Sequence, residues 1–338
     1  MNNTGGEILK IDSLKIGYAS GRNAGAILPP LSASAQKGEL VAVLGRNGIG
    51  KSTLLRTLAG VQPSLGGTVL INGESTAGFS GLQLAQRIGY ISTEVVKVSH
   101  MRVYDLVALG RFPYTNWIGR IDHDAHAAIK EAIIRTGLTH LEGRFISELS
   151  DGERQRAMIA RVLAQDTDIL IMDEPTAFLD ISGKYEIINL MRDLSATGKT
   201  IVFSTHDFSI AINQADKIWL VQEKSITEGA PEDLLLASAF DHLFDQKVVG
   251  FNPDDGSFVF RAQPCGKIFI EGEGILRHWT IKALARKGIN VTDVKMIPYI
   301  QLPSGTGEWI LFTGDSAQSF RSIYDLISRL GREKSSIT

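Results

Sequence analysis

A glycine-rich segment with a lysine and two hydroxyl side chains is the first candidate for chemistry in this sequence. Residues 45–53 are GRNGIGKST; they follow the apolar run Leu40–Leu44 and open a helix-like segment. The pattern G-x-x-x-x-G-K-[ST] in that setting predicts a strand–loop–helix cradle whose backbone N–H groups face phosphate oxygens. We expect the lysine to reach the β- and γ-phosphates of a nucleotide and the serine to hold Mg²⁺. The predicted nucleotide-binding residues of this segment are Gly45, Arg46, Asn47, Gly48, Ile49, Gly50, Lys51, Ser52 and Thr53.

Two acidic side chains follow a second apolar run. Ile169–Met172 is followed directly by Asp173 and Glu174, and α/β sheets bind ligands at the carboxyl ends of their strands. Asp173 is placed to order Mg²⁺ through water, and Glu174 to polarise an attacking water. A pair of solvated acids at a strand end is common, but beside a phosphate cradle the pair favours hydrolysis. A nucleoside triphosphate and Mg²⁺ are therefore the expected cofactors, and the family resemblance described next implies that the nucleotide is ATP.

The segment Leu149–Gln155 narrows the class of nucleotide-binding protein. Its sequence, LSDGERQ, resembles the LSGGQ signature of ATP-binding cassette (ABC) proteins and lies just before the acid-tipped strand, as in that family. Asp151 and Glu153 replace the usual glycine and glutamine. The resemblance implies that residues 150–153 complete the ATP site of a second copy, with Ser150 and Gly152 contacting the γ-phosphate. The same letters also fit a helix capping box formed by the serine and Glu153.

Further elements of the ABC family follow in order. Pro175–Asp180 resembles the D-loop, which implies that Asp180 communicates across a dimer. His206 follows a strand and resembles the switch histidine, which would stabilise the γ-phosphate and orient Glu174 and the water. Tyr18 resembles the aromatic residue that stacks on adenine, although a lone aromatic could equally belong to the core. The resemblance covers about residues 7–250.

One element departs from the family pattern. The family normally has a glutamine after the strand matched by Ile88–Ser92, where it contacts Mg²⁺ and senses the membrane subunit. Here Thr93 or Glu94 occupies that position. Either residue is a candidate Mg²⁺ contact, and a carboxylate there would alter the charge of the site.

A segment of the middle third points to a subfamily and its partners. Val107–Tyr114, VALGRFPY, is similar to the V-x-x-G-R-x-P-Y stretch of ATPases that serve iron-siderophore, haem and cobalamin importers, and it also fits an ordinary helix end and loop. The family resemblance implies a head-to-tail dimer around two ATP molecules, a polytopic membrane permease docking near residues 93–120 and, indirectly, a substrate-binding protein. The expected location is the cytoplasmic face of the cell membrane. An exporter ATPase and a soluble ABC ATPase acting on DNA or ribosomes are the alternatives.

The elements that must position these residues alternate between strand and helix, which predicts a parallel sheet covered by helices. The expected fold is α/β: a P-loop NTPase of the ABC cassette type with a mixed sheet core, an antiparallel β subdomain and a helical insertion, plus a small C-terminal α+β domain. We expect the cassette over residues 1–250, its helical part over about 80–165, and an accessory domain over 251–338. In that domain we expect a strand over Val291–Tyr299 and a helix over Ala317–Leu330.

Composition bounds the classes of partner. The chain has 338 residues and a formal net charge of −2, so no basic excess points to nucleic acid, and no nucleic acid partner is expected. Its single cysteine, Cys265, allows no intramolecular disulfide and fits a reducing compartment. No apolar run approaches the length needed to span a bilayer. A role at a membrane would therefore require a partner.

Overall fold

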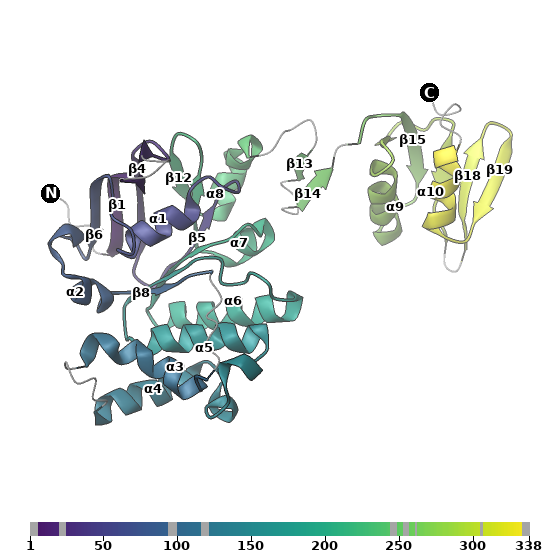
Figure 1. Ribbon diagram of the computed structural model, residues 1–338. Coiled ribbons are helices and arrows are strands. Elements are labelled where there is room, and N and C mark those ends of the chain that lie inside the picture. Colours follow the sequence, from purple (N-terminus) through teal and green to yellow (C-terminus); the bar gives the residue numbers. More distant parts are fainter. Residues whose placement is uncertain are drawn as a thin grey trace. The chain divides into compact units, whose positions relative to one another are not determined.

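The computed structural model describes residues 6–19, 25–93, 100–115, 122–243, 249–252, 257–260, 262–304 and 307–332. The chain divides into two compact units, residues 1–239 and 240–338, and Figure 1 labels many of their helices and strands. The domain boundary expected after residue 250 stays a prediction. Strand β13 (Val249–Asn252) spans that position.

The N-terminal unit begins with an antiparallel sheet of order β4-β1-β6-β7. Leu9, Ile11 and Leu14 of β1 are buried, whereas Lys10 and Asp12 between them are exposed. This alternation is that of a strand with one face against a core. The strands are β1 (Glu7–Lys15), β4 (Leu31–Gln36), β6 (Gly66–Ile71) and β7 (Glu74–Ser75), and a small hairpin pairs β2 (Gly17–Tyr18) with β3 (Gly25–Ala26).

A six-stranded sheet of order β12-β11-β5-β10-β9-β8 forms the centre of this unit. All its pairs are parallel except β11–β12. Every residue of β5, β9 and β10 is buried, as expected of parallel strands covered on both faces. Because these three strands are neighbours, the loops at their carboxyl ends meet at one edge. The strands are β5 (Leu40–Leu44), β8 (Ile88–Ile91), β9 (Ile169–Met172), β10 (Thr200–Ser204), β11 (Lys217–Val221) and β12 (Ile226–Gly229).

Helices surround this sheet (Figure 1). α3 and α4 pack against α5, which also contacts β8 and α6. The strand expected over Ile88–Ser92 is β8, whose buried Ile88 and Ile91 pair with β9 and place it in the sheet. The α-helices of the unit are α1 (Lys51–Leu58), α2 (Gly81–Ala85), α3 (Val103–Ala108), α4 (His123–Arg135), α5 (Asp151–Ala164), α6 (Ile181–Ala196), α7 (Phe208–Gln214) and α8 (Pro231–Leu236). Short 3₁₀ turns are η1 (Thr76–Gly78), η2 (Leu109–Tyr114), η3 (Thr139–Leu141), η4 (Ile146–Glu148) and η5 (Ala239–His242).

The C-terminal unit contains a five-stranded sheet of order β16-β15-β17-β18-β19. Ile268 and Ile270 of β15 and Leu311 of β18 share a core with Leu284 of α9 and Leu326 of α10. The sheet strands are β15 (Gly266–Glu271), β16 (Ile289–Thr292), β17 (Tyr299–Gln301), β18 (Trp309–Thr313) and β19 (Ser316–Phe320); the helices are α9 (Ile275–Ala285) and α10 (Ile323–Arg332), and β13 pairs with β14 (Ser257–Phe260).

Two sequence-based expectations for this unit are wrong. The single strand expected over Val291–Tyr299 is two strands, because β16 and β17 pair in parallel with opposite sides of β15 and the chain must cross over β15 between them. The helix expected over Ala317–Leu330 begins only at Ile323. Its first part is β19, because a turn at Gly314, whose φ is +66°, returns the chain alongside β18.

Candidate nucleotide-binding site

The loop between β5 and α1 forms an open concave turn. Gly48 and Gly50 adopt φ values of +77° and +112°, a conformation that residues with a Cβ avoid. A Cβ at Gly50 would also lie 3.3 Å from Ile27 Cγ2. The two glycines therefore let the backbone turn toward the space in front of α1, where a helix N-terminus favours anions.

Lys51 begins α1 and lies inside this turn. Its side chain is almost fully buried, and its Nζ donates hydrogen bonds to the carbonyl oxygens of Gly45 (2.8 Å) and Arg46 (3.3 Å). Burial lowers the pKa of the Lys51 ammonium below its ordinary 10.5, and the nearby carboxylates of Glu174 and Asp173 act in the opposite direction. The ammonium is thus held against the loop carbonyls, with the carboxylates of Glu174 and Asp173 nearby.

Asp173, directly after β9, accepts hydrogen bonds from two hydroxyl groups, one at the start of α1 and one at the end of β10. Its side chain is 2% exposed, and its Oδ1 accepts hydrogen bonds from Ser52 Oγ (3.1 Å) and Ser204 Oγ (2.7 Å). A hydroxyl and a carboxylate oxygen at this separation are the ligand types that Mg²⁺ prefers. Within the described residues no group of three or more His, Cys, Asp or Glu side chains surrounds a common point, so phosphate and water oxygens would have to complete a coordination shell.

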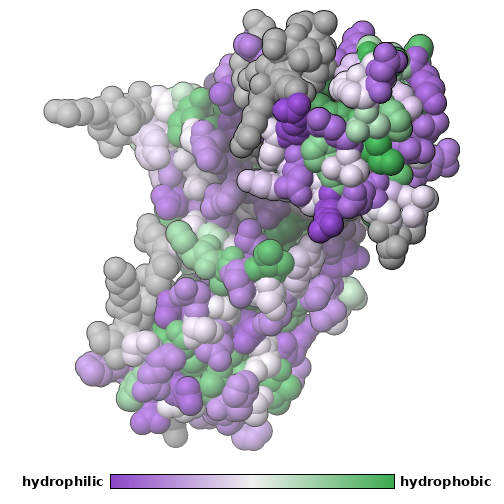
Figure 2. Space-filling view, turned by 90° about the vertical axis from the view of Figure 1, so that its right-hand side faces the viewer, coloured by the Kyte–Doolittle hydropathy of each residue, from purple (hydrophilic) through white to green (hydrophobic). Residues whose placement is uncertain are grey.

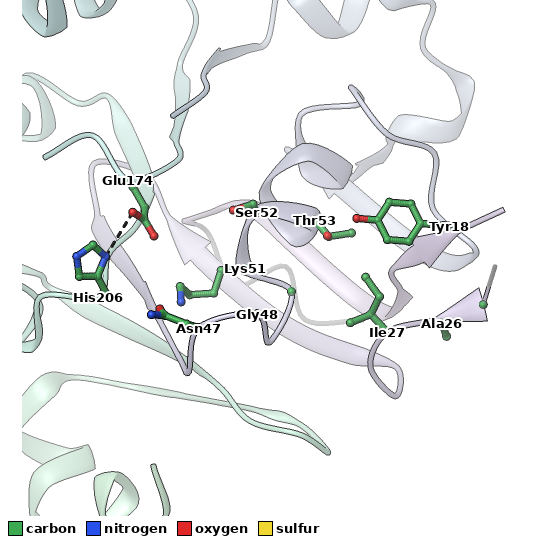
Figure 3. A pocket seen from close by; sticks show the side chains of 12 residues that line it. Tyr18, Ala26, Ile27, Asn47, Gly48, Lys51, Ser52, Thr53, Glu174 and His206 are labelled. Atoms are coloured by element: carbon green, nitrogen blue, oxygen red, sulfur yellow. Dashed lines mark ion pairs between the residues drawn. The ribbon is translucent and has the colours of Figure 1, made fainter. Parts of the chain in front are cut away.

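Glu174 and His206 face each other beside the lysine. Glu174 Oε2 lies 3.3 Å from His206 Nδ1, and this contact is drawn in Figure 3. Glu174 has a φ of +48°, unusual for a residue with a side chain, and its N–H donates to Ser204 Oγ at 2.9 Å. That hydrogen bond fixes the direction in which the carboxylate leaves the sheet, toward the cavity.

These groups line one cavity of about 820 Å³. Its polar end holds Lys51, Glu174 and His206, and its other end holds Tyr18 and Ile27 (Figure 3). One end can thus face charged phosphates and the other an apolar ring. The lining residues are Tyr18, Gly25, Ala26, Ile27, Asn47, Gly48, Gly50, Lys51, Ser52, Thr53, Glu174 and His206.

Not all predicted cradle residues line this cavity. Gly45 and Arg46 offer carbonyl oxygens to the lysine, while Ile49 packs against the core. Conversely, sequence reasoning missed Gly25, Ala26 and Ile27. They reach the cavity because Gly25 pairs with Tyr18 in the β2–β3 hairpin. No sequence motif predicts this pairing.

The signature segment lines a different cavity, of about 460 Å³, at the start of α5. Ser150 and Glu153 form the capping box: the serine hydroxyl accepts from Glu153 N at 3.3 Å, and the glutamate carboxylate accepts from Ser150 N at 2.8 Å. Asp151 pairs with Arg154 at 2.9 Å. The cradle residues thus line one cavity and Ser150, Gly152 and Glu153 another, while Asp151 also lines a third cavity, of about 290 Å³, together with Glu174.

The D-loop segment borders this second cavity. Asp180 caps α6, with its Oδ1 accepting from Gly183 N at 2.8 Å. Next to it, Phe178 adopts a φ of +64° and is 79% exposed. Ile181 is similarly exposed. An apolar surface therefore lies beside the signature.

Of the two candidates at the missing glutamine position, only Thr93 lies within the described residues; Glu94 lies outside them. Thr93 Oγ1 donates to the backbone carbonyl of Asp173 at 3.1 Å. It lines a separate cavity of about 290 Å³ together with Glu174. Thr93 is thus close to both acids, and its contact with Mg²⁺ stays a prediction.

The segment Val107–Tyr114, which resembles a stretch of importer ATPases, packs against α5. Arg111 Nη1 donates to Ala164 O at 2.9 Å, and its guanidinium lies 4.1 Å from the centre of the Tyr114 ring. Gly110 packs so closely that a Cβ would meet Arg161 O at 1.9 Å. Between these anchors Phe112 is 72% exposed. The motif therefore holds an exposed aromatic side chain on a rigid support.

The fold and the cradle define a class: a P-loop protein that binds a nucleoside triphosphate at the carboxyl edge of a mixed sheet. Comparison with known proteins identifies the family. Residues 28–177 match the family described as ABC transporter, and residues 265–331 match the iron ABC transporter C-terminal domain. The chain belongs to the ATP-binding proteins of ABC transporters and is an ABC transporter ATPase.

Relatives and a solved structure agree with this assignment. An uncharacterized ABC transporter ATP-binding protein of Methanocaldococcus jannaschii is 34% identical over 280 residues, which cover 80% of this chain and 95% of that protein. The ferric enterobactin transport ATP-binding protein FepC of Escherichia coli is 33% identical, over 70% of this chain and 86% of its own. CbiO1 of Clostridium perfringens, part of the ABC transporter complex CbiONQ, superposes with a TM-score of 0.60 at 29% identity, covering 69% of this chain and 92% of that one.

The expected cassette fold with an additional C-terminal domain is confirmed. Among the helices that the structure describes, none combines the length and the hydropathy that crossing a bilayer requires.

Proposed function

We propose that this chain binds and hydrolyses ATP to power an importer of a metal chelate, an iron-siderophore, haem or cobalamin, from the cytoplasmic face of the membrane. The match of residues 265–331 to an iron transporter domain and the likeness to an enterobactin transport protein support this class of solute. The segment Val107–Tyr114 supports it independently. A polytopic permease is the direct partner, and a substrate-binding protein acts through the permease.

The observation that carries the mechanism is the separation of the two half-sites. Lys51 and Glu174 line one cavity, whereas Ser150 and Gly152 line another. A triphosphate in the first cavity lacks the signature contacts of its own chain. We infer that a second copy supplies them head to tail, so that ATP binding closes the dimer and hydrolysis opens it.

Within each closed site the residues divide the work. Lys51 neutralises the β- and γ-phosphates, and Asn47 and the neighbouring backbone N–H groups surround them. Tyr18 stacks on adenine at the apolar end of the cavity. Glu174 orients and polarises the water that attacks the γ-phosphate. His206, whose Nδ1 lies 3.3 Å from the Glu174 carboxylate, orients that carboxylate and stabilises the γ-phosphate.

Mg²⁺ would be held by Ser52 directly and by Asp173 through water, since their oxygens are already adjacent. When bound, the ion neutralises charge on the β- and γ-phosphates. Asp180, at the start of α6, borders the signature cavity and is placed to relay its state to the second copy.

An exposed apolar face is available for the permease. Leu109 and Phe112 of η2 are exposed, and Leu82 of α2 is exposed nearby in the fold, since Gln86 Nε2 donates to Pro113 O at 3.0 Å. An amphipathic helix is the kind of partner that such side chains receive. Docking here would transmit closure of the dimer to the permease.

Trapping the closed state tests the head-to-tail dimer. The full chain with Glu174→Gln should retain ATP and dimerise when ATP and Mg²⁺ are added, as followed by sedimentation velocity. Adding Ser150→Ala should raise the ATP concentration needed for dimerisation at least tenfold. Ser80→Ala is the matched control, because Ser80 caps α2 with the same reciprocal box away from the site. Equal dimerisation of the Ser150 and Ser80 variants would refute the signature contact.

Import is tested on the assembled transporter. The chain should co-purify from membranes with a polytopic protein through its apolar face, and Phe112→Glu should abolish that association without changing nucleotide affinity. ATP hydrolysis by the complex in liposomes should rise when a binding protein loaded with a ferric siderophore or cobalamin is added. Stimulation by a substrate offered on the cytoplasmic side alone would indicate an exporter instead.

A further inference from the structure

Strand β10 ends with a polar residue in the interior of the protein. Hydrophilic side chains cover much of the face shown in Figure 2, whereas Ser204 is completely buried. The three residues before it, Ile201–Phe203, are apolar and equally buried. A buried hydroxyl group destabilises the fold unless it is hydrogen-bonded. The partners of Ser204 therefore indicate why a serine, and not another apolar residue, ends this strand.

The hydroxyl group of Ser204 joins the two acids of the site. Its Oγ donates a hydrogen bond to Asp173 Oδ1 at 2.7 Å and accepts one from the backbone N–H of Glu174 at 2.9 Å. The direction of both bonds is fixed, because an amide N–H can only donate and the hydroxyl group has a single hydrogen to give to the carboxylate. One side chain thus contacts both the carboxylate proposed to order Mg²⁺ and the backbone of the residue proposed to activate water.

Strand register explains why this contact forms. The last registered pair between β9 and β10 is Met172 with Phe203. Asp173 and Ser204 are the next residues along these two parallel strands, so they lie side by side where the chain leaves the sheet. The contact therefore follows from the pairing of the two central strands and requires no adjustment of a loop.

The turn at Glu174 depends on hydrogen bonds from both neighbouring strands. Its φ of +48° is one that residues with a Cβ rarely adopt. The N–H of the peptide group before it binds Ser204, and the carbonyl oxygen of that same group, on Asp173, accepts from Thr93 Oγ1 at 3.1 Å. Thr93 follows β8, and β8 and β10 lie on opposite sides of β9. Two hydroxyl groups therefore hold this peptide group from both sides, and its orientation directs the Glu174 carboxylate toward His206 (Figure 3).

We propose that Ser204 is a positioning residue for ATP hydrolysis, which holds the carboxylate of Asp173 and the backbone of Glu174 in one arrangement. The inference rests on the proposed function, in which Glu174 activates the attacking water. Because Ser204 is completely buried, it does not line the nucleotide cavity and acts on the reaction only through the two acids. Removing its hydroxyl group should therefore slow hydrolysis and leave ATP binding unchanged.

Steady-state kinetics of the full chain test this role. Ser204→Ala should lower kcat for ATP hydrolysis at least tenfold, since misplacing a catalytic group by about 1 Å can slow a reaction by about 100-fold. The KM for ATP should stay within twofold of the wild-type value. Ser195→Ala is the matched control, because Ser195 is also buried but donates to the carbonyl oxygen of Gly38, which precedes β5 at the opposite end of the sheet. A wild-type kcat for Ser204→Ala, or an equal fall for both variants, would overturn the proposal.

A double-mutant cycle tests whether Ser204 acts through Glu174. In the Glu174→Gln background, Ser204→Ala should change the residual single-turnover rate by less than threefold, since residues that act as a unit have non-additive effects. Asp173 keeps its hydrogen bond from Ser52 in both backgrounds. A fall of tenfold or more in this background would show that Ser204 supports the rate by another route, and the assignment would be wrong.

ATP-driven dimerisation of the same double variant reports folding and nucleotide binding. Its half-maximal ATP concentration, followed by sedimentation velocity, should match that of the Glu174→Gln parent within twofold. Loss of dimerisation in the double variant alone would mean that Ser204 serves folding or ATP binding, which the positioning role does not allow. Hydrolysis at the wild-type rate by Glu174→Gln itself would instead contradict the proposed function, whatever the Ser204 variants do.

Discussion

The carboxylate of Glu153 accepts hydrogen bonds from both the backbone N–H and the hydroxyl of Ser150, at 2.8 Å and 2.9 Å. These two hydrogen bonds lower the pKa of the Glu153 carboxyl below its ordinary 4.5. The serine proposed to contact the γ-phosphate of a second copy is thus bound to an acid on its own helix. A negative charge lies where the resemblance to the ABC family leads one to expect a neutral glutamine.

Replacing that charge should strengthen closure of the dimer. Glu153→Gln keeps a side chain that completes a capping box but removes repulsion toward the approaching triphosphate. Since one charge–charge term near a protein surface is worth about 1 kcal/mol or more, the ATP concentration for half-maximal dimerisation should fall by roughly fivefold in the Glu174→Gln background. Sedimentation velocity over an ATP titration measures it.

The control for this change is Glu148→Gln, which removes the same charge from η4 just before the signature. It should leave the titration within twofold of the parent. Raising the ionic strength should shrink the difference between the Glu153 variant and its parent, because salt screens exposed charges. A Glu153→Gln protein that needs more ATP than its parent would show that the carboxylate helps to bind, and that the repulsion argument is wrong.

Burial of Lys51 predicts a pH dependence of ATP binding. Burial lowers the pKa of its ammonium, and only the charged form attracts phosphates. ATP affinity should therefore be full below the pKa that Lys51 has in the free protein and fall as the pH rises through it, by up to tenfold per pH unit. Because that pKa lies below the ordinary 10.5, the fall should begin at a lower pH than for an exposed lysine. Bound phosphates raise the pKa again, so binding there takes up a proton.

Isothermal titration at pH 7 to 10 in two buffers of different ionisation enthalpy measures both quantities. Lys51→Arg is the comparison, since a guanidinium stays charged throughout this range. The ATP affinity of Lys51→Arg is expected to be weaker than that of the wild type and not to change with pH. Identical profiles for wild type and the arginine variant would exclude titration of Lys51 as the cause, and absence of proton uptake by the wild type would do the same.

The cradle can be predicted from the sequence because its residues are contiguous in the chain. Gly48, Gly50 and Lys51 are neighbours in the chain, and the strand before them and the helix after them follow from local apolar spacing. The acids after β9 are equally local. Their meeting with the cradle follows from one rule, that neighbouring parallel strands bring their carboxyl ends to one edge.

Long-range pairing accounts for what the sequence did not predict. Ala26 and Ile27 reach the cavity only because a hairpin folds back on Tyr18. The strand expected over Val291–Tyr299 splits because both of its ends pair with β15, on opposite sides. Alternation of apolar residues describes each half correctly but carries no information about which neighbour a strand will find. Residues 317–320 likewise become a strand through β18.

A close backbone approach in the helical part yields a further prediction. Gly110 lies against the backbone of α5, and a Cβ there would stand 1.9 Å from Arg161 O, a distance that no relaxed side chain tolerates. Gly110→Ala must therefore push η2 away from α5 and strain the hydrogen bond from Arg111 to Ala164 O. Overpacking of this kind typically costs about 1–3 kcal/mol.

The cassette should accordingly lose about 2 kcal/mol of stability, which for a unit of this size lowers its thermal midpoint by roughly 4–8 °C. Calorimetry of the full chain measures the shift. Gly143→Ala is the matched control, because the nearest atom to its added methyl would be Arg102 Nη1 at 3.7 Å, an ordinary contact. Since η2 carries the exposed Phe112, Gly110→Ala should also weaken co-purification with the permease at temperatures where the cassette is still folded. If both alanine variants melt together with wild type, η2 does not rest on α5 as closely as Gly110 indicates.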